Sequence, residues 1–196
     1  MLIKWSDAID RAVRACGKTP LIEIDGVSVT KKELEVINGL DSVRVKRLAF
    51  TLLCVAKYWN CVRGDMNDGW VNVPDKDIMS MANIKVSVRM QSDMFRELRD
   101  LGLVRFSKRV DNLNMQVLFI SDDDAEMLIT DCRNLGNQFM ARTDSNYTKC
   151  KQCGAVVRKK SNSQKYCKAC AAEIYVKQSV ESVMRNRVPT EKNVFV

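Results

Sequence analysis

The chain has 196 residues, 46% of them hydrophobic and 29% charged, which suffices for one sizeable domain or two small ones and excludes a wholly disordered chain. It contains no histidine. That absence excludes Ser-His and Cys-His nucleophile pairs and every His-ligated metal site, and it removes the commonest general base. We therefore expect a protein that is not an enzyme.

Charge is distributed unevenly along the chain. The net charge of +8 comes from 32 Lys and Arg residues against 24 Asp and Glu residues. Residues 1–40 are neutral, 41–121 carry +4, 122–141 carry −4 and 142–196 carry +8. The net charge of the whole chain equals that of its last segment, which predicts a basic C-terminal module suited to polyanionic partners.

The apolar residues give no sign of a targeting or membrane segment. Residues 1–7 lack the apolar run of a signal peptide, and no stretch approaches the roughly 18 apolar residues of a membrane span. We expect a cytoplasmic protein with no membrane partner. Thiols stay reduced in that compartment, so the eight cysteines are interpreted as metal ligands or buried apolar residues before disulfides are considered.

Residues 1–40 predict an N-terminal extension made of a helix and a hairpin. The strand-like runs 21–24 and 27–30 flank Asp25-Gly26, a dipeptide that suits a two-residue hairpin turn. Thr30 and Glu33 have the spacing of a capping box, which predicts a helix that begins there and ends near Gly39.

Residues 41–121 predict three helices and a second hairpin. Apolar residues at steps of three and four predict a long helix over 42–59, and a short strand over 70–73 precedes Pro74, which suits the start of a short helix. A further helix over 87–101 ends at Gly102. Two strand-like runs, 103–110 and 115–120, then flank a four-residue turn.

The order of these elements resembles the winged helix-turn-helix domains. The resemblance lies in residues 77–84 (DIMSMANI) and 95–104 (FRELRDLGLV), where a Leu-Gly-Leu junction joins the recognition helix to the wing. It implies an α+β, mainly helical fold with a β-hairpin wing, whose helix 87–101 enters the major groove of double-stranded DNA. The whole chain is similar to DNA-binding proteins of phages and mobile elements, such as transcriptional regulators or replication accessories.

The acidic run 122–124 is expected to cap a further helix that uses Met127, Leu128 and Leu135 as apolar positions. This trailing helix completes a winged-helix domain over 41–141. Residues 142–148 then form a polar linker, and the composition becomes basic directly after it.

Four cysteines, Cys150, Cys153, Cys167 and Cys170, form two CxxC pairs separated by thirteen residues. Two residues between cysteines let both thiolates face one ion, and two such pairs complete a tetrahedral shell. The spacing predicts one structural Zn²⁺, because four protein thiolates leave no position for a catalytic water. The isolated cysteines are interpreted as small apolar residues; they are Cys16, Cys54, Cys61 and Cys132.

The second CxxC pair runs directly into a helical pattern that continues toward Arg187. A ligand pair on the first turn of a helix resembles the zinc-ribbon and treble-clef modules. The resemblance implies a zinc module over 142–196 that ends in a helix. It gives only weak support for nucleic-acid binding.

The candidate nucleic-acid contacts are polar or basic side chains on three segments. Those on and before helix 87–101 would reach base edges, those on the wing would contact phosphates, and those of the zinc module would hold the backbone, with Tyr166 stacking on a base. They are Lys85, Ser87, Arg89, Gln91, Ser92 and Arg96; Arg105, Lys108 and Arg109; and Arg158, Lys159, Lys160, Lys165, Tyr166 and Lys168.

Other interpretations stay open. The arginines of helix 87–101 can belong to a solvated face that pairs with the acidic residues interspersed among them. The same folds also suit an interaction or inhibitor protein that binds a host protein or nucleoprotein complex, and a homodimer is compatible with either function. Asp75 and Asp77 have residue types found at metal-dependent nuclease sites, but their place after Pro74 favours a role at a helix start.

Overall fold

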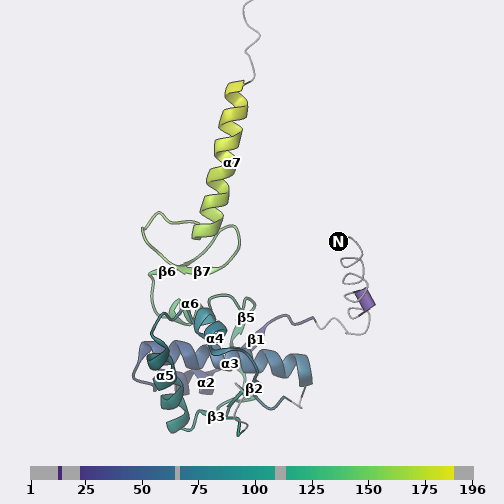
Figure 1. The fold of residues 1–196 in the computed structure, drawn as a ribbon, viewed down its shortest axis with the longest axis vertical. Coiled ribbons are helices and arrows are strands. Elements are labelled where there is room, and N and C mark those ends of the chain that lie inside the picture. Colours follow the sequence, from purple (N-terminus) through teal and green to yellow (C-terminus); the bar gives the residue numbers. More distant parts are fainter. Residues whose placement is uncertain (1–12, 15–22, 65–66, 109–113, 188–196) are drawn as a thin grey trace, which may run out of the picture.

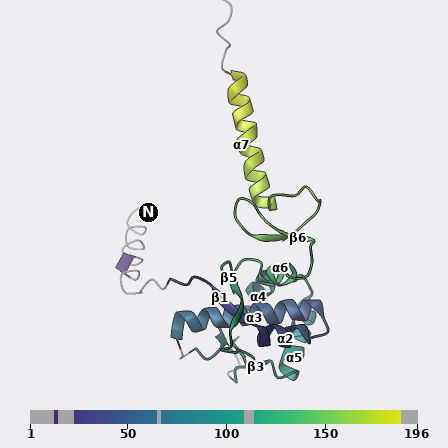
Figure 2. The same ribbon diagram turned by 180° about the vertical axis from the view of Figure 1, so that it is seen from behind.

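The computed structural model describes residues 13–14, 23–64, 67–108 and 114–187, and it has a mixed α+β fold in which helices make up about half of these residues. Small antiparallel sheets and shorter helices surround one long helix, α3 (Val43–Arg63), and a final helix, α7 (Lys168–Arg187), extends away from the rest (Figures 1 and 2).

Helix α3 is the centre of the core. Every residue from Leu48 to Ala56 is buried, so this part of the helix is covered on all sides. Helix α2 (Lys31–Asn38) and helix α6 (Leu135–Met140) pack against it, and the rings of Phe50 and Phe139 lie 5.3 Å apart between centroids. The capping box that opens α2 is present, as the sequence predicts.

Two further helices follow as predicted. Helix α4 (Asp75–Met81) begins after Pro74, and helix α5 (Val88–Asp100) begins at Ser87, whose Oγ accepts a hydrogen bond from the Met90 amide. A tight turn joins them, in which Asn83 has a positive φ of 52°. The face of α5 that carries Met94, Phe95 and Leu98 is buried against the core.

A three-stranded antiparallel sheet completes this part of the fold. Strands β3 (Val104–Phe106) and β4 (Met115–Val117) pair with each other, and β2 (Trp70–Val71) pairs with the other edge of β4, which gives the order β2-β4-β3. Gly102 has a φ of 72° between α5 and β3, a conformation that favours glycine. The sheet lies beside α5 at one end of the molecule (Figure 1).

Two expectations about the sheets are wrong. Strand β1 (Val27–Thr30) does not pair with the preceding run, since residues 23–26 form no strand and residues 21–22 lie outside the described residues. Its partner is β5 (Ala125–Ile129), a strand in the segment for which the sequence predicts a helix. The pairing sets the buried Val27 opposite the buried Ile129, so a long-range apolar contact outweighs both local patterns.

The C-terminal part is a small cysteine-rich unit that packs on α6. Strands β6 (Tyr147–Lys149) and β7 (Val156–Arg158) form a hairpin, so the end of the predicted linker is a strand. The buried Asn137 side chain of α6 donates a hydrogen bond of 3.1 Å from Nδ2 to the Val156 carbonyl. Among the described residues, no helix is both long and apolar enough to cross a membrane.

Candidate metal centre and nucleic-acid interface

The four cysteines of the two CxxC pairs converge on one point. The Sγ atoms of Cys150, Cys153, Cys167 and Cys170 all lie within 4.8 Å of one another, and those of Cys153 and Cys167 are 3.8 Å apart. Four thiolates around Zn²⁺ at about 2.3 Å require Sγ–Sγ separations of roughly 3.8 Å. The cluster is therefore consistent with one metal ion held by four sulfur ligands.

Backbone hydrogen bonds build the first cysteine pair. The Cys150 amide donates to the Ala155 carbonyl and the Gly154 amide donates to the Cys150 carbonyl, each at 2.9 Å. Gly154 closes this turn with a φ of 73°, as its place after the pair suggests. The Lys151 amide donates to the Lys165 carbonyl at 3.0 Å, which brings the second pair beside the first.

The pKa values of two thiols of the cluster are shifted in opposite directions. Backbone amides, first that of Cys153 and then that of Cys167, lower the pKa of the Cys150 thiol to about 6. The pKa of the Cys170 thiol is raised, because its hydrogen bond with Cys167 and its burial both favour the protonated form. Four thiolates cannot share this site without a cation to offset their repulsion, and a divalent ion does so.

An ion pair outside the cluster supports the first cysteine pair. Arg133 Nη2 donates to the Cys153 carbonyl at 2.8 Å and to Asp131 Oδ2 at 2.9 Å. These bonds hold the guanidinium against the turn that presents the ligands. The contact between Arg133 and Cys153 is not predictable from the sequence, since the two residues are 20 positions apart and no motif joins them.

The side chains predicted to reach base edges divide into two kinds. Lys85 and Arg89 are exposed, and no hydrogen bond or ion pair engages either side chain within the described part of the chain. The others already have local partners: Ser87 caps α5, Gln91 donates to the Val86 carbonyl, Ser92 donates to the Val88 carbonyl, and Arg96 pairs with Asp93 at 3.2 Å.

The wing residues predicted to contact phosphates differ in their surroundings. Arg105 donates to Gln116 Oε1, and Gln116 in turn donates to the Asp68 carboxylate at 2.8 Å. Lys108 is exposed, whereas Arg109 lies outside the described residues. Arg105 is thus hydrogen-bonded to the sheet although the residue is exposed, and Lys108 is exposed as well.

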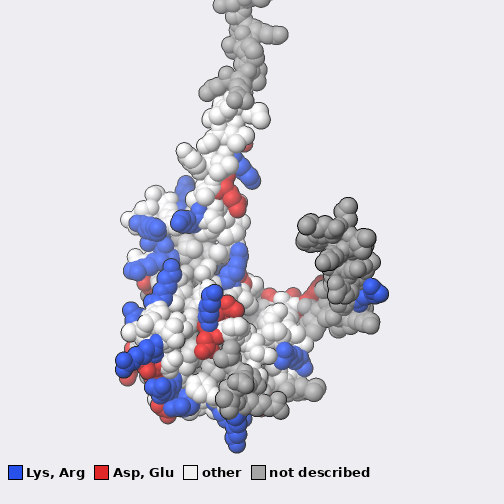
Figure 3. Space-filling model, in the orientation of Figure 1, with Lys and Arg blue, Asp and Glu red and all other residues white. Residues whose placement is uncertain are grey.

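The remaining predicted nucleic-acid contacts lie in the cysteine-rich unit. Figure 3 shows Lys and Arg side chains along one edge of the molecule, over the β6–β7 hairpin and toward α5, with Asp and Glu side chains interspersed near α5. Lys159 and Tyr166 are half-buried. The other predicted contacts of this unit are exposed; they are Arg158, Lys160, Lys165 and Lys168.

No protein-family model matches this chain, and neither a curated protein nor a solved structure matches it significantly. The functional inference therefore depends on the geometry and chemistry of these two regions.

Proposed function

We propose that this chain binds double-stranded DNA through a winged helix-turn-helix domain over residues 41–141, assisted by a basic module that holds one structural Zn²⁺. The observation that carries the proposal is the exposure of Lys85 and Arg89, which lie just before and in the first turn of α5 with no partner among the described residues. In a helix-turn-helix protein, this turn of the second helix contacts base edges.

The arrangement of elements supports this assignment. Helix α4, the tight turn at Asn83, helix α5 and the β3–β4 hairpin follow in the order that the winged-helix family uses, and β2 adds the third strand of the sheet. The buried face of α5 points into the core, and its polar face is left for a ligand.

Zinc is the metal that the donor set favours. Four thiolates in tetrahedral reach of one another are typical of structural zinc sites, and they leave no position for substrate or water. The ion would hold the β6–β7 hairpin to the start of α7 and so fix the surrounding cations in place. Clustered cations of this kind bind phosphates with little sequence preference.

Fluorescence anisotropy with a labelled duplex, across a series of salt concentrations, tests the proposal. We expect log K to fall linearly with log salt, and the slope should decrease by about 0.9 for each phosphate contact that a variant removes. The double variants Lys85→Gln/Arg89→Gln and Lys160→Gln/Lys165→Gln remove cations from α5 and from the zinc module. Lys31→Gln, an exposed lysine on α2, is the matched control.

Binding that is weakened by both double variants and unchanged by the control supports the proposal. Absence of binding at low salt, or binding with no salt dependence, contradicts it.

A second candidate function is association with protein, and one observation favours it. Helix α7 exposes Val176, Val180 and Val183, which recur at steps of four and three on one side of the helix. A second copy of the chain is the simplest partner for such a stripe, since two identical helices can cover each other's valines. Light scattering tests it: a dimer mass that Val180→Ser/Val183→Ser reduces to a monomer mass supports association, and a monomer mass for the unaltered chain contradicts it.

A further inference from the structure

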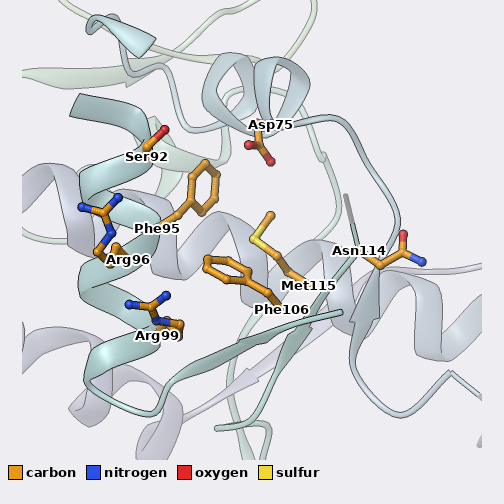
Figure 4. Close-up of a pocket in the computed structure, with 8 residues that line it drawn as sticks. All are labelled: Asp75, Ser92, Phe95, Arg96, Arg99, Phe106, Asn114 and Met115. Atoms are coloured by element: carbon orange, nitrogen blue, oxygen red, sulfur yellow. The ribbon is translucent and has the colours of Figure 1, made fainter. Parts of the chain in front are cut away.

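A groove of about 310 Å³ lies between α5 and the β3–β4 hairpin, next to the start of α4 (Figure 4). No sequence motif indicates this groove, because its walls come from segments far apart in the chain. Ligand pockets in proteins begin at roughly 300 Å³, so the groove has room for a small ligand or for one unit of a larger one. Its walls come from α5, from both strands of the hairpin and from Asp75 at the start of α4.

The floor of the groove is apolar and aromatic. Phe95 and Met115 are 4% and 3% exposed and belong to the core, whereas Phe106 at the end of β3 keeps 37% of its surface exposed. Figure 4 shows the two phenylalanine rings and the methionine between α5 and the strands. The partly exposed ring of Phe106 is a flat surface on which another ring can stack.

The wall formed by α5 carries two guanidinium groups. Arg99 lies with its Cζ 5.8 Å from the centre of the Phe106 ring, and Arg96 is one turn before it. Their partners, Asp93 for Arg96 and Asp100 for Arg99, belong to exposed ion pairs at 3.2 and 2.7 Å. Exposed ion pairs of this kind contribute little to the free energy of folding. A bound phosphate can therefore replace the aspartate as the partner of either arginine.

Two other lining residues, Asp75 and Ser92, carry polar groups that can bind the edge of a base. Asp75 at the start of α4 is half-buried, and burial raises the pKa of its carboxyl group. Ser92 adds a hydroxyl from α5, whose proton is donated to the Val88 carbonyl and whose oxygen can still accept. The serine oxygen and the carboxyl group can accept hydrogen bonds from the N–H groups of a base, and a protonated carboxyl group can also donate one.

We propose that this groove binds an unpaired nucleotide, with the base stacked on Phe106 and the phosphate on Arg96 and Arg99. Aromatic platforms beside cations are the arrangement that binds single-stranded nucleic acid, because every base has a π-face and every nucleotide a phosphate. The inference rests on the proposed function, since it adds an unpaired base to a DNA-binding surface that includes α5. A free nucleotide has the same chemistry and is the other source of such a ligand.

Three probes test the groove: a labelled duplex, the same duplex with one unpaired thymidine, and thymidine monophosphate as a competitor. We expect the unpaired base to strengthen binding roughly tenfold. Phe106→Ala should abolish that advantage without changing the affinity for the plain duplex, and Arg99→Gln should reduce it. Leu118→Ala, an exposed residue just after β4, is the matched control. Circular dichroism of each variant establishes that the fold is intact.

Arg99→Gln lies on the helix surface and keeps the inference testable if Phe106→Ala does not fold. Equal affinity for the two duplexes, or an advantage that survives in every folded groove variant, overturns it. Competition by thymidine monophosphate that depends on Phe106 supports the groove, and the tenfold advantage of the unpaired thymidine identifies DNA as the source of the nucleotide. Should the plain duplex fail to bind while a single strand binds in a Phe106-dependent manner, the groove inference stands and the proposed duplex function falls.

Discussion

Lys57 Nζ lies 2.9 Å from Glu33 Oε1 in an ion pair in which the Glu33 side chain is fully buried and the Lys57 side chain is 13% exposed. Glu33 also accepts hydrogen bonds from two backbone amides, that of Thr30 at 2.7 Å and that of Ser121 at 2.9 Å. One carboxylate therefore joins the start of α2, the middle of α3 and the segment before β5.

Replacing Lys57 by methionine should destabilise the fold by about 3–5 kcal/mol, because it leaves a buried carboxylate without its counter-charge. Urea denaturation followed by circular dichroism measures the change in the free energy of unfolding. Lys32→Met is the control, since the Lys32–Asp123 pair is exposed and should contribute less than about 1 kcal/mol.

A double-mutant cycle with Glu33→Gln separates the pair from other effects of the substitutions. We expect the double variant to be less destabilised than the sum of the single variants, with a coupling of about 1–3 kcal/mol. Strictly additive effects would show that the two side chains do not interact in solution.

The Glu33 contacts also show how far the sequence predicts the fold. The capping box between Thr30 and Glu33 spans three residues, so it is visible in the sequence, and the helices α2 to α5 follow from local periodicity in the same way. The contacts of Glu33 with Lys57 and Ser121 cross 24 and 88 residues and leave no local pattern. Strand β5 cannot be predicted from its own residues for the same reason, because its conformation depends on pairing with the distant β1.

The two candidate sites differ in the same way: the metal centre follows from local motifs, and the groove depends on contacts between distant residues. Each CxxC pair is a local motif whose spacing already indicates a shared ion, and the four sulfur atoms do converge. The groove between α5 and the hairpin carries no such motif. Its Phe106 and Asp75 lie 31 positions apart and acquire a common role only when the sheet packs beside the helices.

Metal content provides a direct test of the cysteine cluster. Purified protein should contain one Zn²⁺ per chain by mass spectrometry, and Cys150→Ser or Cys170→Ser should lower this content sharply, since loss of one thiolate opens the tetrahedral shell. Cys132→Ser changes an exposed cysteine outside the cluster and should leave the zinc content unchanged. Equal zinc content in all three variants would mean that the ion binds elsewhere.

Gly136 in α6 is a position where a single methyl group should be costly. A Cβ atom there would lie 2.0 Å from the Ala82 carbonyl oxygen, and that carbonyl is fixed by a hydrogen bond of 2.7 Å from Arg47 Nη2. We expect Gly136→Ala to lower the free energy of unfolding by about 3 kcal/mol, as overpacking against backbone does. Because α6 also holds the β6–β7 hairpin, the variant should lose zinc faster to a chelator.

The matched control is Gly39→Ala. Gly39 has an ordinary helical φ of −70°, and its nearest non-neighbouring atom would be 3.4 Å from the added Cβ. Its stability should stay the same or rise by up to about 1 kcal/mol. If the two alanine variants unfold at the same urea concentration, the close approach of α6 to Ala82 does not exist in solution.

The Asp131–Arg133 ion pair should make the stability of the cysteine-rich unit depend on pH. Hydrogen bonds from Arg133 lower the pKa of the Asp131 carboxyl group, so the folded state favours the carboxylate. The stabilisation is present above the ordinary carboxyl pKa of about 3.9 and is lost as the pH falls through the lower pKa of the folded state. Both side chains are partly exposed, so the contribution should stay below about 1 kcal/mol.

Carbon-detected NMR titration of Asp131 in the unaltered chain and in Arg133→Gln measures this effect. The variant should return the pKa of Asp131 toward its ordinary value, and it should release zinc faster because Arg133 no longer holds the Cys153 carbonyl. Arg142→Gln removes an exposed pair with Glu126 and should change neither quantity. An Asp131 pKa that is the same with and without Arg133 would show that the guanidinium does not hold this turn, since charge-assisted hydrogen bonds at 2.9 Å must shift the titration.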